Sequence, residues 1–281
     1  EIWSSLGSDD RFLRYAARIA LEFQPVDRWR ERLSNESDPS TVVSAVVALA
    51  RVGKPIDLGI AQASLLKLDL DAMSVDQRLA WDRALQLVFI RLGAPEEDDR
   101  LIWLDRLDGR FPADDDRENR ELIQLLTYLG SETVAAKGLE LLQREKRTEG
   151  PDLEELIARN RGYGGAIAAM LAAHPDLEQL HAAFVLRNAR VGWTAERRVA
   201  YFRWFEKARA WSGGASYQGF LTKIDQDAYQ NATDAERLAV EALGARTPYR
   251  AAERPAAEGP GRDWTVEQVL AEAGDELRGR D

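Results

Sequence analysis

The sequence contains no cysteine among its 281 residues. Disulfides, zinc sites built on thiolates and covalent haem attachment are therefore excluded within these residues. Proteins without cysteine occur in every compartment, so this absence does not indicate where the protein works.

Histidine is almost as scarce, with only His174 and His181. Pro175 lies between the two and is expected to begin a helix, which leaves His174 in the preceding turn. Because cysteine and any H-E-x-x-H spacing are missing as well, no metal site is predicted.

Motifs of catalytic and ligand-binding loops are also missing. The glycine cluster at 162–165 lacks the Gly-Lys-Ser/Thr of a phosphate-binding loop and predicts a tight turn between helices. The acidic runs at 96–99 and 114–116 lack the spacing of a calcium loop and predict helix N-termini. Ser216 has no G-x-S-x-G surroundings. The sequence therefore predicts a protein that is not an enzyme and binds no cofactor of its own.

Long hydrophobic runs and an excess of positive charge are absent too. The longest apolar stretch, Val42 to Ala50, is far shorter than the roughly 20 residues that cross a bilayer. A net charge of −10 opposes general nucleic-acid binding. The N-terminal residues do not form a signal peptide, and the chain is interpreted as a segment of a larger protein. Neither membrane insertion nor nucleic acid is expected.

What the sequence does contain is helical periodicity along almost its whole length. Apolar residues make up 45% and charged residues 31%, a balance typical of folded globular proteins. Leu122, Leu125, Leu126 and Leu129 show the i, i+3, i+4, i+7 spacing of an amphipathic helix. No stretch alternates long enough to indicate a strand, so an all-α fold is predicted. The expected helices span residues 9–23, 25–34, 39–52, 56–67, 75–92, 96–107, 115–130, 132–146, 151–159, 163–173, 176–189, 194–211, 216–230, 234–244 and 264–273.

Capping signals mark the ends of these helices. Ser or Thr followed three residues later by Glu or Gln predicts a capping box at a helix start. Three such pairs occur, at Ser74 with Gln77, Thr233 with Glu236, and Thr265 with Gln268. Pairs of helices at about 30 to 45 residues per pair predict an α-solenoid, a HEAT- or armadillo-like superhelix of antiparallel helix pairs. We expect this domain to cover residues 1–245, followed at 246–281 by an extended linker and a short helix.

Arginine and aromatic residues gather between positions 187 and 220. Arginine accounts for 32 of the 38 basic residues in the chain, which reflects either genome composition or pairing with carboxylates. A dense arginine–aromatic stretch is typical of a protein-interaction hot spot, but also of a helix packed inside a stack. Both alternatives remain open at this stage. The candidate contact residues are Arg187, Arg190, Trp193, Arg197, Arg198, Tyr201, Arg203, Trp204, Gly213, Gly214 and Tyr217.

Three segments of this stretch resemble a known family. They are FVLRNARVGWT at 184–194, RVAYFRWF at 198–205 and GGASYQGF at 213–220. They are similar to large exported proteins of planctomycetes and verrucomicrobia, which join a β-propeller dehydrogenase-like region, a HEAT-like helical region and a C-terminal c-type cytochrome domain. Further similar pieces are NREL at 119–122, LLTYL at 125–129, NRGYG at 160–164 and GRDWT at 261–265. The resemblance covers about residues 110 to 281 and contains no catalytic motif.

The resemblance implies a helical region that precedes a cytochrome domain. Haem is then expected only in a downstream domain, because Cys-x-x-Cys-His is absent here. The implied location is outside the cytoplasm, periplasmic or exported. The implied role is a non-catalytic scaffold whose partners are neighbouring domains of the same polypeptide or other proteins. The alternative is a general peptide- or protein-binding HEAT-like module unrelated to redox chemistry.

Overall fold

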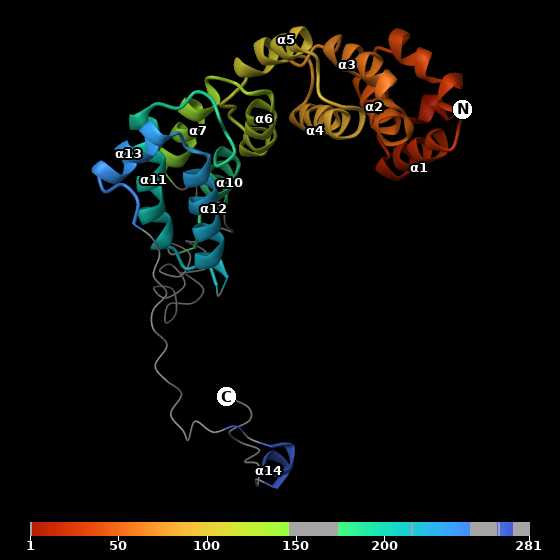
Figure 1. The fold of residues 1–281 in the computed structure, drawn as a ribbon. Helices are drawn as coiled ribbons and strands as arrows, with labels where there is room; N and C mark the ends of the chain where they lie inside the picture. Colours follow the sequence, from red (N-terminus) through yellow and green to blue (C-terminus); the bar gives the residue numbers. More distant parts are fainter. Residues whose placement is uncertain (1, 146–173, 215, 248–262, 264, 272–281) are drawn as a thin grey trace, which may run out of the picture. The chain divides into compact units, whose positions relative to one another are not determined.

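The computed structural model describes residues 2–145, 174–214, 216–247, 263 and 265–271 (Figure 1). These residues form helices and contain no strand, so the all-α prediction is confirmed for the described part of the chain. The chain divides into two compact units, Glu1–Pro248 and Tyr249–Asp281. Most of the linker expected from residue 246, the helices expected at 151–159 and 163–173, and the glycine cluster at 162–165 lie outside the described residues.

The first unit begins with helices that lie close to their expected positions. These are η1 (Trp3–Ser5), α1 (Arg11–Glu22), η2 (Val26–Arg28), η3 (Arg30–Asn35), α2 (Pro39–Val52), η4 (Pro55–Asp57), α3 (Leu58–Leu66), α4 (Val75–Leu92), α5 (Glu97–Asp108), α6 (Asp116–Leu129) and α7 (Val134–Gln143). After the undescribed segment follow α10 (Leu177–Leu186), α11 (Ala195–Arg209), α12 (Tyr217–Asn231) and α13 (Asp234–Ala242). The second unit contains α14 (Val266–Ala271).

Local capping accounts for many of these boundaries. The three predicted boxes, Ser74–Gln77, Thr233–Glu236 and Thr265–Gln268, are all present, each with the two reciprocal hydrogen bonds. In each box the side chains satisfy backbone N–H groups that the first helical turn leaves without partners. The left-handed Gly130, at φ 71°, ends α6 where the next helix must turn away.

One expected α-helix, at 25–34, is instead the pair of 3-10 helices η2 and η3. Trp29 separates them at φ −136°, outside the helical region. Its indole is buried and its Nε1 donates to the Gln24 carbonyl at 3.3 Å. Tertiary burial of one large ring thus interrupts a segment whose local pattern is helical.

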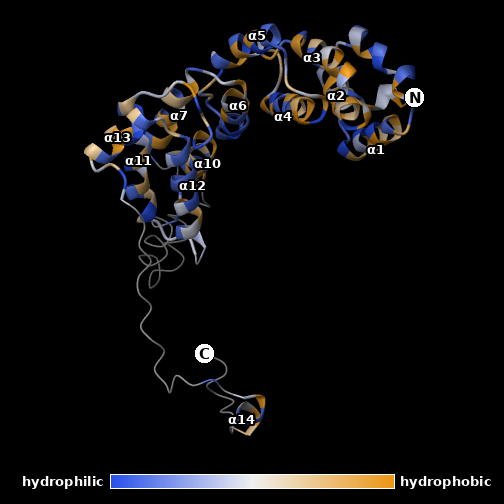
Figure 2. Cartoon of the chain, viewed as in Figure 1, coloured by the Kyte–Doolittle hydropathy of each residue, from blue (hydrophilic) through white to orange (hydrophobic). Residues whose placement is uncertain are grey.

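The apolar helix α2 is buried, as its composition predicts. Val42, Val46 and Leu49 have no exposed surface. α2 packs against α1, α3 and α4, so neighbours cover several of its faces. Most other helices combine hydrophobic and hydrophilic residues, visible as orange and blue on the same helix in Figure 2. Those helices bury one face and leave the other to solvent.

Helices pack against elements further along the chain as well as against their immediate neighbours. α2 contacts α4, α4 contacts α6, α6 contacts α10, and α10 contacts α12. α7 also contacts α11, and α11 contacts α13. Each of these contacts skips at least one intervening helix of the chain.

Polar side chains join several of these helices at nearly constant sequence separation. The α3 side chain of Gln62 bonds to two residues of α5, and arginines of α4 bond to glutamates of α6. The separations are 37 residues for Gln62–Asp99, 41 for Gln62–Trp103, 40 for Arg78–Glu118, and 38 for both Arg83–Glu121 and Arg198–Glu236. These links therefore span about 40 residues each, whereas other interhelical links have different spans, such as 29 residues for Arg51–Glu22 and 58 residues for Arg120–Glu178.

Candidate functional site

The predicted contact residues centre on α11, whose first turn is capped by the Thr194 hydroxyl. Tyr201 and Trp204 point from this helix into the protein interior. The Tyr201 hydroxyl donates to the Ala183 carbonyl at 2.7 Å, and Trp204 Nε1 donates to Gln179 Oε1 at 2.9 Å. Burial raises the pKa of Tyr201 far above its ordinary value. These two aromatic residues join α11 to α10 and satisfy their own polar atoms inside the core.

Arg198 is also part of the interior. Only 1% of the residue is exposed, and its guanidinium carbon lies 3.8 Å from the centroid of the Trp193 ring. Its Nε donates to Glu236 Oε2 at 3.1 Å, which connects α11 to α13. Because a buried arginine must be both paired and stacked to offset its desolvation, this side chain has a structural role.

The Gly213–Gly214 turn leaves room for the Tyr217 ring to pack against the backbone. A Cβ atom on Gly213 would lie 2.2 Å from the Tyr217 ring, so only glycine fits there. Gly214 has a positive φ of 76°, which favours glycine. The buried Tyr217 hydroxyl donates to the Ala208 carbonyl at 2.8 Å. The turn therefore packs the start of α12 against the end of α11.

Four of the candidate contact residues lie in the core of the described structure, which is the packing alternative left open by the sequence. Arg198, Tyr201, Trp204 and Tyr217 are buried, and a partner cannot reach their side chains. The physical reason is that α11 is covered by α7, α12 and α13. Of the remaining candidates, Arg190, Arg203 and Gly214 are exposed, and Arg187, Trp193, Arg197 and Gly213 are half-buried.

The half-buried arginines of this region have internal partners. Arg187 stacks on the Phe184 ring at 3.5 Å and lies 3.4 Å from an Asp227 carboxylate oxygen. Arg197 donates to the Gly192 carbonyl at 2.8 Å. Their guanidinium groups therefore already take part in the packing of this region.

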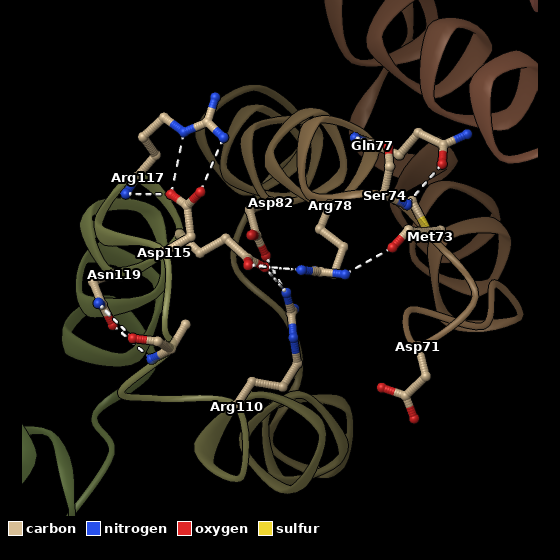
Figure 3. A network of polar contacts seen from close by, with 12 residues as sticks. Asp71, Met73, Ser74, Gln77, Arg78, Asp82, Arg110, Asp115, Arg117 and Asn119 are labelled. Carbon is tan, nitrogen blue, oxygen red and sulfur yellow. Dashed lines mark hydrogen bonds and ion pairs between the residues drawn. The ribbon is translucent and has the colours of Figure 1, made fainter.

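A second group of charged residues lies between α4 and α6 (Figure 3). Arg78 donates to both carboxylate oxygens of Glu118, at 2.7 and 2.9 Å. Arg110, which follows α5, donates to Glu118 at 3.0 Å and to Asp82 Oδ1 at 3.3 Å. Two arginines and two carboxylates thus join α4, α6 and the turn between α5 and α6.

The two carboxylates of this network differ in their titration. The hydrogen bonds from Arg78 lower the pKa of Glu118. Asp82 has no exposed surface, and desolvation raises its pKa from 3.8 to about 7 despite the nearby Arg110. Its Oδ2 has no hydrogen-bond partner among the described residues. Since no substrate can reach a fully buried carboxylate, Asp82 affects stability rather than catalysis.

Metal ligands do not gather anywhere in the part of the chain that the structure describes. No group of three or more His, Asp or Glu side chains there could hold an ion. His181 Nε2 lies 3.2 Å from the Arg120 carbonyl, an ordinary packing contact between α10 and α6. The acidic runs lie at helix starts, and Asp115 caps α6.

A surface that the sequence reasoning missed lies on α1. A cleft of about 230 Å³ opens between α1, α2 and α4. The arginines of α1 along it are Arg11, Arg14 and Arg18, and Tyr15 lies among them. Phe12 and Tyr15 are 69% and 59% exposed, and Arg11 and Arg18 stack on them at 4.6 and 5.1 Å. This is an arginine–aromatic helix that other helices leave open.

The sequence signal for this surface is the segment RFLRYAAR at 11–18. Like α11 it combines arginines with aromatic residues, but it contains two aromatic residues whereas α11 contains four. Only burial separates the two helices, because α11 packs its rings inward and α1 leaves Phe12 and Tyr15 in solvent.

No helix in the described residues combines the length and apolar character needed to span a bilayer.

Comparisons with known proteins identify no relative of this chain. No family model, curated protein or solved structure matches it.

Proposed function

We propose that the chain is a non-catalytic helical-repeat scaffold, an α-solenoid of the HEAT or armadillo kind, that works by contact with neighbouring domains or other proteins. The observation that carries this proposal is that the polar links within three pairs of helices two apart in the chain, namely α3–α5, α4–α6 and α11–α13, span 35 to 41 residues. HEAT and armadillo repeats have a period of about 40 to 47 residues.

The packing order supports the same architecture. In a solenoid each repeat buries its apolar face only against the next repeat, so contacts run between equivalent helices of consecutive repeats. The contacts from α2 to α4, from α4 to α6 and from α10 to α12 follow this rule, whereas α6 and α10 are joined across 58 residues by Arg120–Glu178. Arginine–glutamate ion pairs such as Arg78–Glu118 then hold consecutive repeats together.

Hydrogen exchange on the whole chain tests the repeat architecture. Leu221 of α12 is fully buried, so Leu221→Ala leaves a cavity that destabilises its surroundings by about 2 to 5 kcal/mol. In a stack with nearest-neighbour coupling, exchange rises in α11 to α13 and stays unchanged in α1 and α2. An equal rise in every helix would show a single cooperative globule and contradict the solenoid.

The wider context of the scaffold is an exported redox protein. Its support is the resemblance of segments such as FVLRNARVGWT at 184–194 to the helical regions of cytochrome-containing proteins. Haem then binds in a downstream domain, and the protein works outside the cytoplasm. The gene beyond the codon for Asp281 decides this part of the proposal. A Cys-x-x-Cys-His motif there, in a domain that binds this chain when the two are purified and mixed, is the expected result.

The second candidate is a general peptide- or protein-binding HEAT-like module. The exposed arginine–aromatic face of α1 favours it, because such residues dominate binding energies at interfaces. A gene without the haem motif, together with peptide binding by α1, would select this candidate. The scaffold architecture is common to both.

A further inference from the structure

We propose that the cleft between α1, α2 and α4 binds an acidic segment of a partner protein, with Arg11 and Arg14 holding its carboxylates. This inference rests on the proposed function as a protein-contact scaffold and names the chemistry of the partner. The cleft is also lined by Val43 and Val47 of α2 and by Ala80 of α4.

Charge is the first argument. Among the described residues, no carboxylate lies within ion-pair distance of Arg11 or Arg14, whereas Arg18 pairs with Glu22. The interhelical arginines behave differently: Arg78 and Arg83, for example, each bind a glutamate. In a chain of net charge −10, Arg11 and Arg14 are thus two guanidinium groups that no described carboxylate neutralises by an ion pair, although Asp9 and Asp10 precede them in the sequence.

Of the acidic residues nearest to this site in the sequence, Asp10 and Glu22 are already engaged and Asp9 is exposed. Asp10 caps α1 by accepting hydrogen bonds from the backbone N–H groups of Phe12 and Leu13. Glu22 is bound by both Arg18 and Arg51, and only 10% of its side chain is exposed. Arg14 also donates from Nη1 to the Ser8 carbonyl, so Arg11 and the remaining N–H groups of Arg14 are what this site offers to a carboxylate supplied from outside.

The spacing of the arginines and the size of the cleft fit side chains of a protein. Residues three apart on a helix have Cβ atoms about 5 to 6 Å apart. The guanidinium groups of Arg11 and Arg14 are therefore close enough for each to bind one of two neighbouring carboxylates. A cleft of about 230 Å³ is smaller than the roughly 300 to 1,000 Å³ of small-molecule pockets. The valines and the Tyr15 ring offer apolar contact to the stems of the bound side chains.

A nucleic acid fits this surface less well. Phosphate polyanions bind through many cations at once, and their affinity depends on the counterions released by each. Three arginines on a chain of net charge −10 supply few such contacts, and the remaining surface charge repels a long polyanion. An acidic peptide needs only two bidentate pairs and gains apolar contact as well.

Fluorescence anisotropy with a labelled octaglutamate peptide tests the inference on the whole chain. The native protein is expected to bind the peptide, more weakly as salt rises, and not to bind octaglutamine. The double variant Arg11→Glu with Arg14→Glu should lose at least about tenfold in affinity. Circular dichroism and thermal unfolding verify that this variant is folded. A folded variant that binds as well as the native chain overturns the inference.

A matched control carries the same change of net charge elsewhere. Arg190→Glu with Arg203→Glu alters two exposed arginines of the region first predicted from sequence, and octaglutamate affinity should stay within about twofold. Equal loss in this control overturns the inference, because only net charge would then matter. Single-stranded RNA that binds the same arginines as tightly as the peptide also overturns it.

Self-association is the remaining outcome. If the native chain dimerises, the α1 variant abolishes the dimer, and octaglutamate does not bind, the cleft belongs to a second copy and the inference is overturned. None of these results touches the scaffold proposal, which depends on the hydrogen-exchange pattern after Leu221→Ala. The two proposals therefore fail separately.

Discussion

Replacing Asp82 by asparagine should remove a pH-dependent loss of stability. The folded protein holds a proton on this buried carboxyl up to a pKa of about 7, whereas the ordinary value is 3.8. Between these two pH values the native state binds a proton that the unfolded state has released. Raising the pH through this window therefore favours unfolding. Above about pH 7 both states are ionised and the loss is complete.

The size of the effect follows from the pKa. Each pH unit inside the window costs about 1.4 kcal/mol, so a rise from pH 5 to pH 8 costs the native chain about 3 kcal/mol through Asp82. Asparagine has the same shape as the protonated carboxyl and carries no proton to release. The free energy of unfolding of Asp82→Asn minus that of wild type should therefore be about 3 kcal/mol larger at pH 8 than at pH 5.

Urea unfolding followed by circular dichroism at both pH values measures this difference. Subtracting wild type from variant cancels the titration of the other acids, including Glu118 and Glu121, whose charges also raise the pKa of Asp82. Asp105→Asn, at an exposed position of α5, removes a carboxylate of the same type and is the matched control. If Asp82→Asn and wild type lose stability equally between pH 5 and pH 8, the assignment of a protonated Asp82 is wrong.

Two further predictions concern packing and ion pairing. Gly213→Ala places a methyl group against the Tyr217 ring and should lower the free energy of unfolding by about 1 to 3 kcal/mol. Gly219 lies inside α12 with free space around it, so Gly219→Ala should instead raise the free energy of unfolding by about 0.5 to 1 kcal/mol. Equal changes in the thermal unfolding temperature of the two variants would contradict the predicted clash at Gly213. Glu118→Gln removes the charge that Arg78 binds and should lower the free energy of unfolding by about 3 kcal/mol in chemical denaturation.

The control for Glu118→Gln is Glu97→Gln, because Glu97 also pairs with an arginine but lies in solvent. The Glu97 side chain is 69% exposed in its pair with Arg100, compared with 6% for Glu118. Water screens an exposed pair within one helix, so Glu97→Gln should change the free energy of unfolding much less than Glu118→Gln does. A loss at Glu118 as small as that at Glu97 would mean that water screens the Arg78–Glu118 pair.

Local signals predicted most helices because they act within a few residues. Ser74 and Gln77 cap α4 wherever that helix packs, since both hydrogen bonds form inside one turn. The prediction was wrong where a tertiary contact outweighs the local pattern. At Trp29, burial of the indole divides the α-helix expected at 25–34 into η2 and η3.

The sequence by itself determined the helical class, the positions of most helix ends and the absence of thiolate chemistry. Only the tertiary structure decided which arginine–aromatic helix is a surface. Helical spacing places Tyr201 and Trp204 on α11, and Phe12 and Tyr15 on α1, but it does not say whether another helix covers them. α11 is enclosed by α7, α12 and α13, while Phe12 and Tyr15 of α1 remain in solvent. Exposure depends on contacts between residues far apart in the chain, and no local pattern records those contacts.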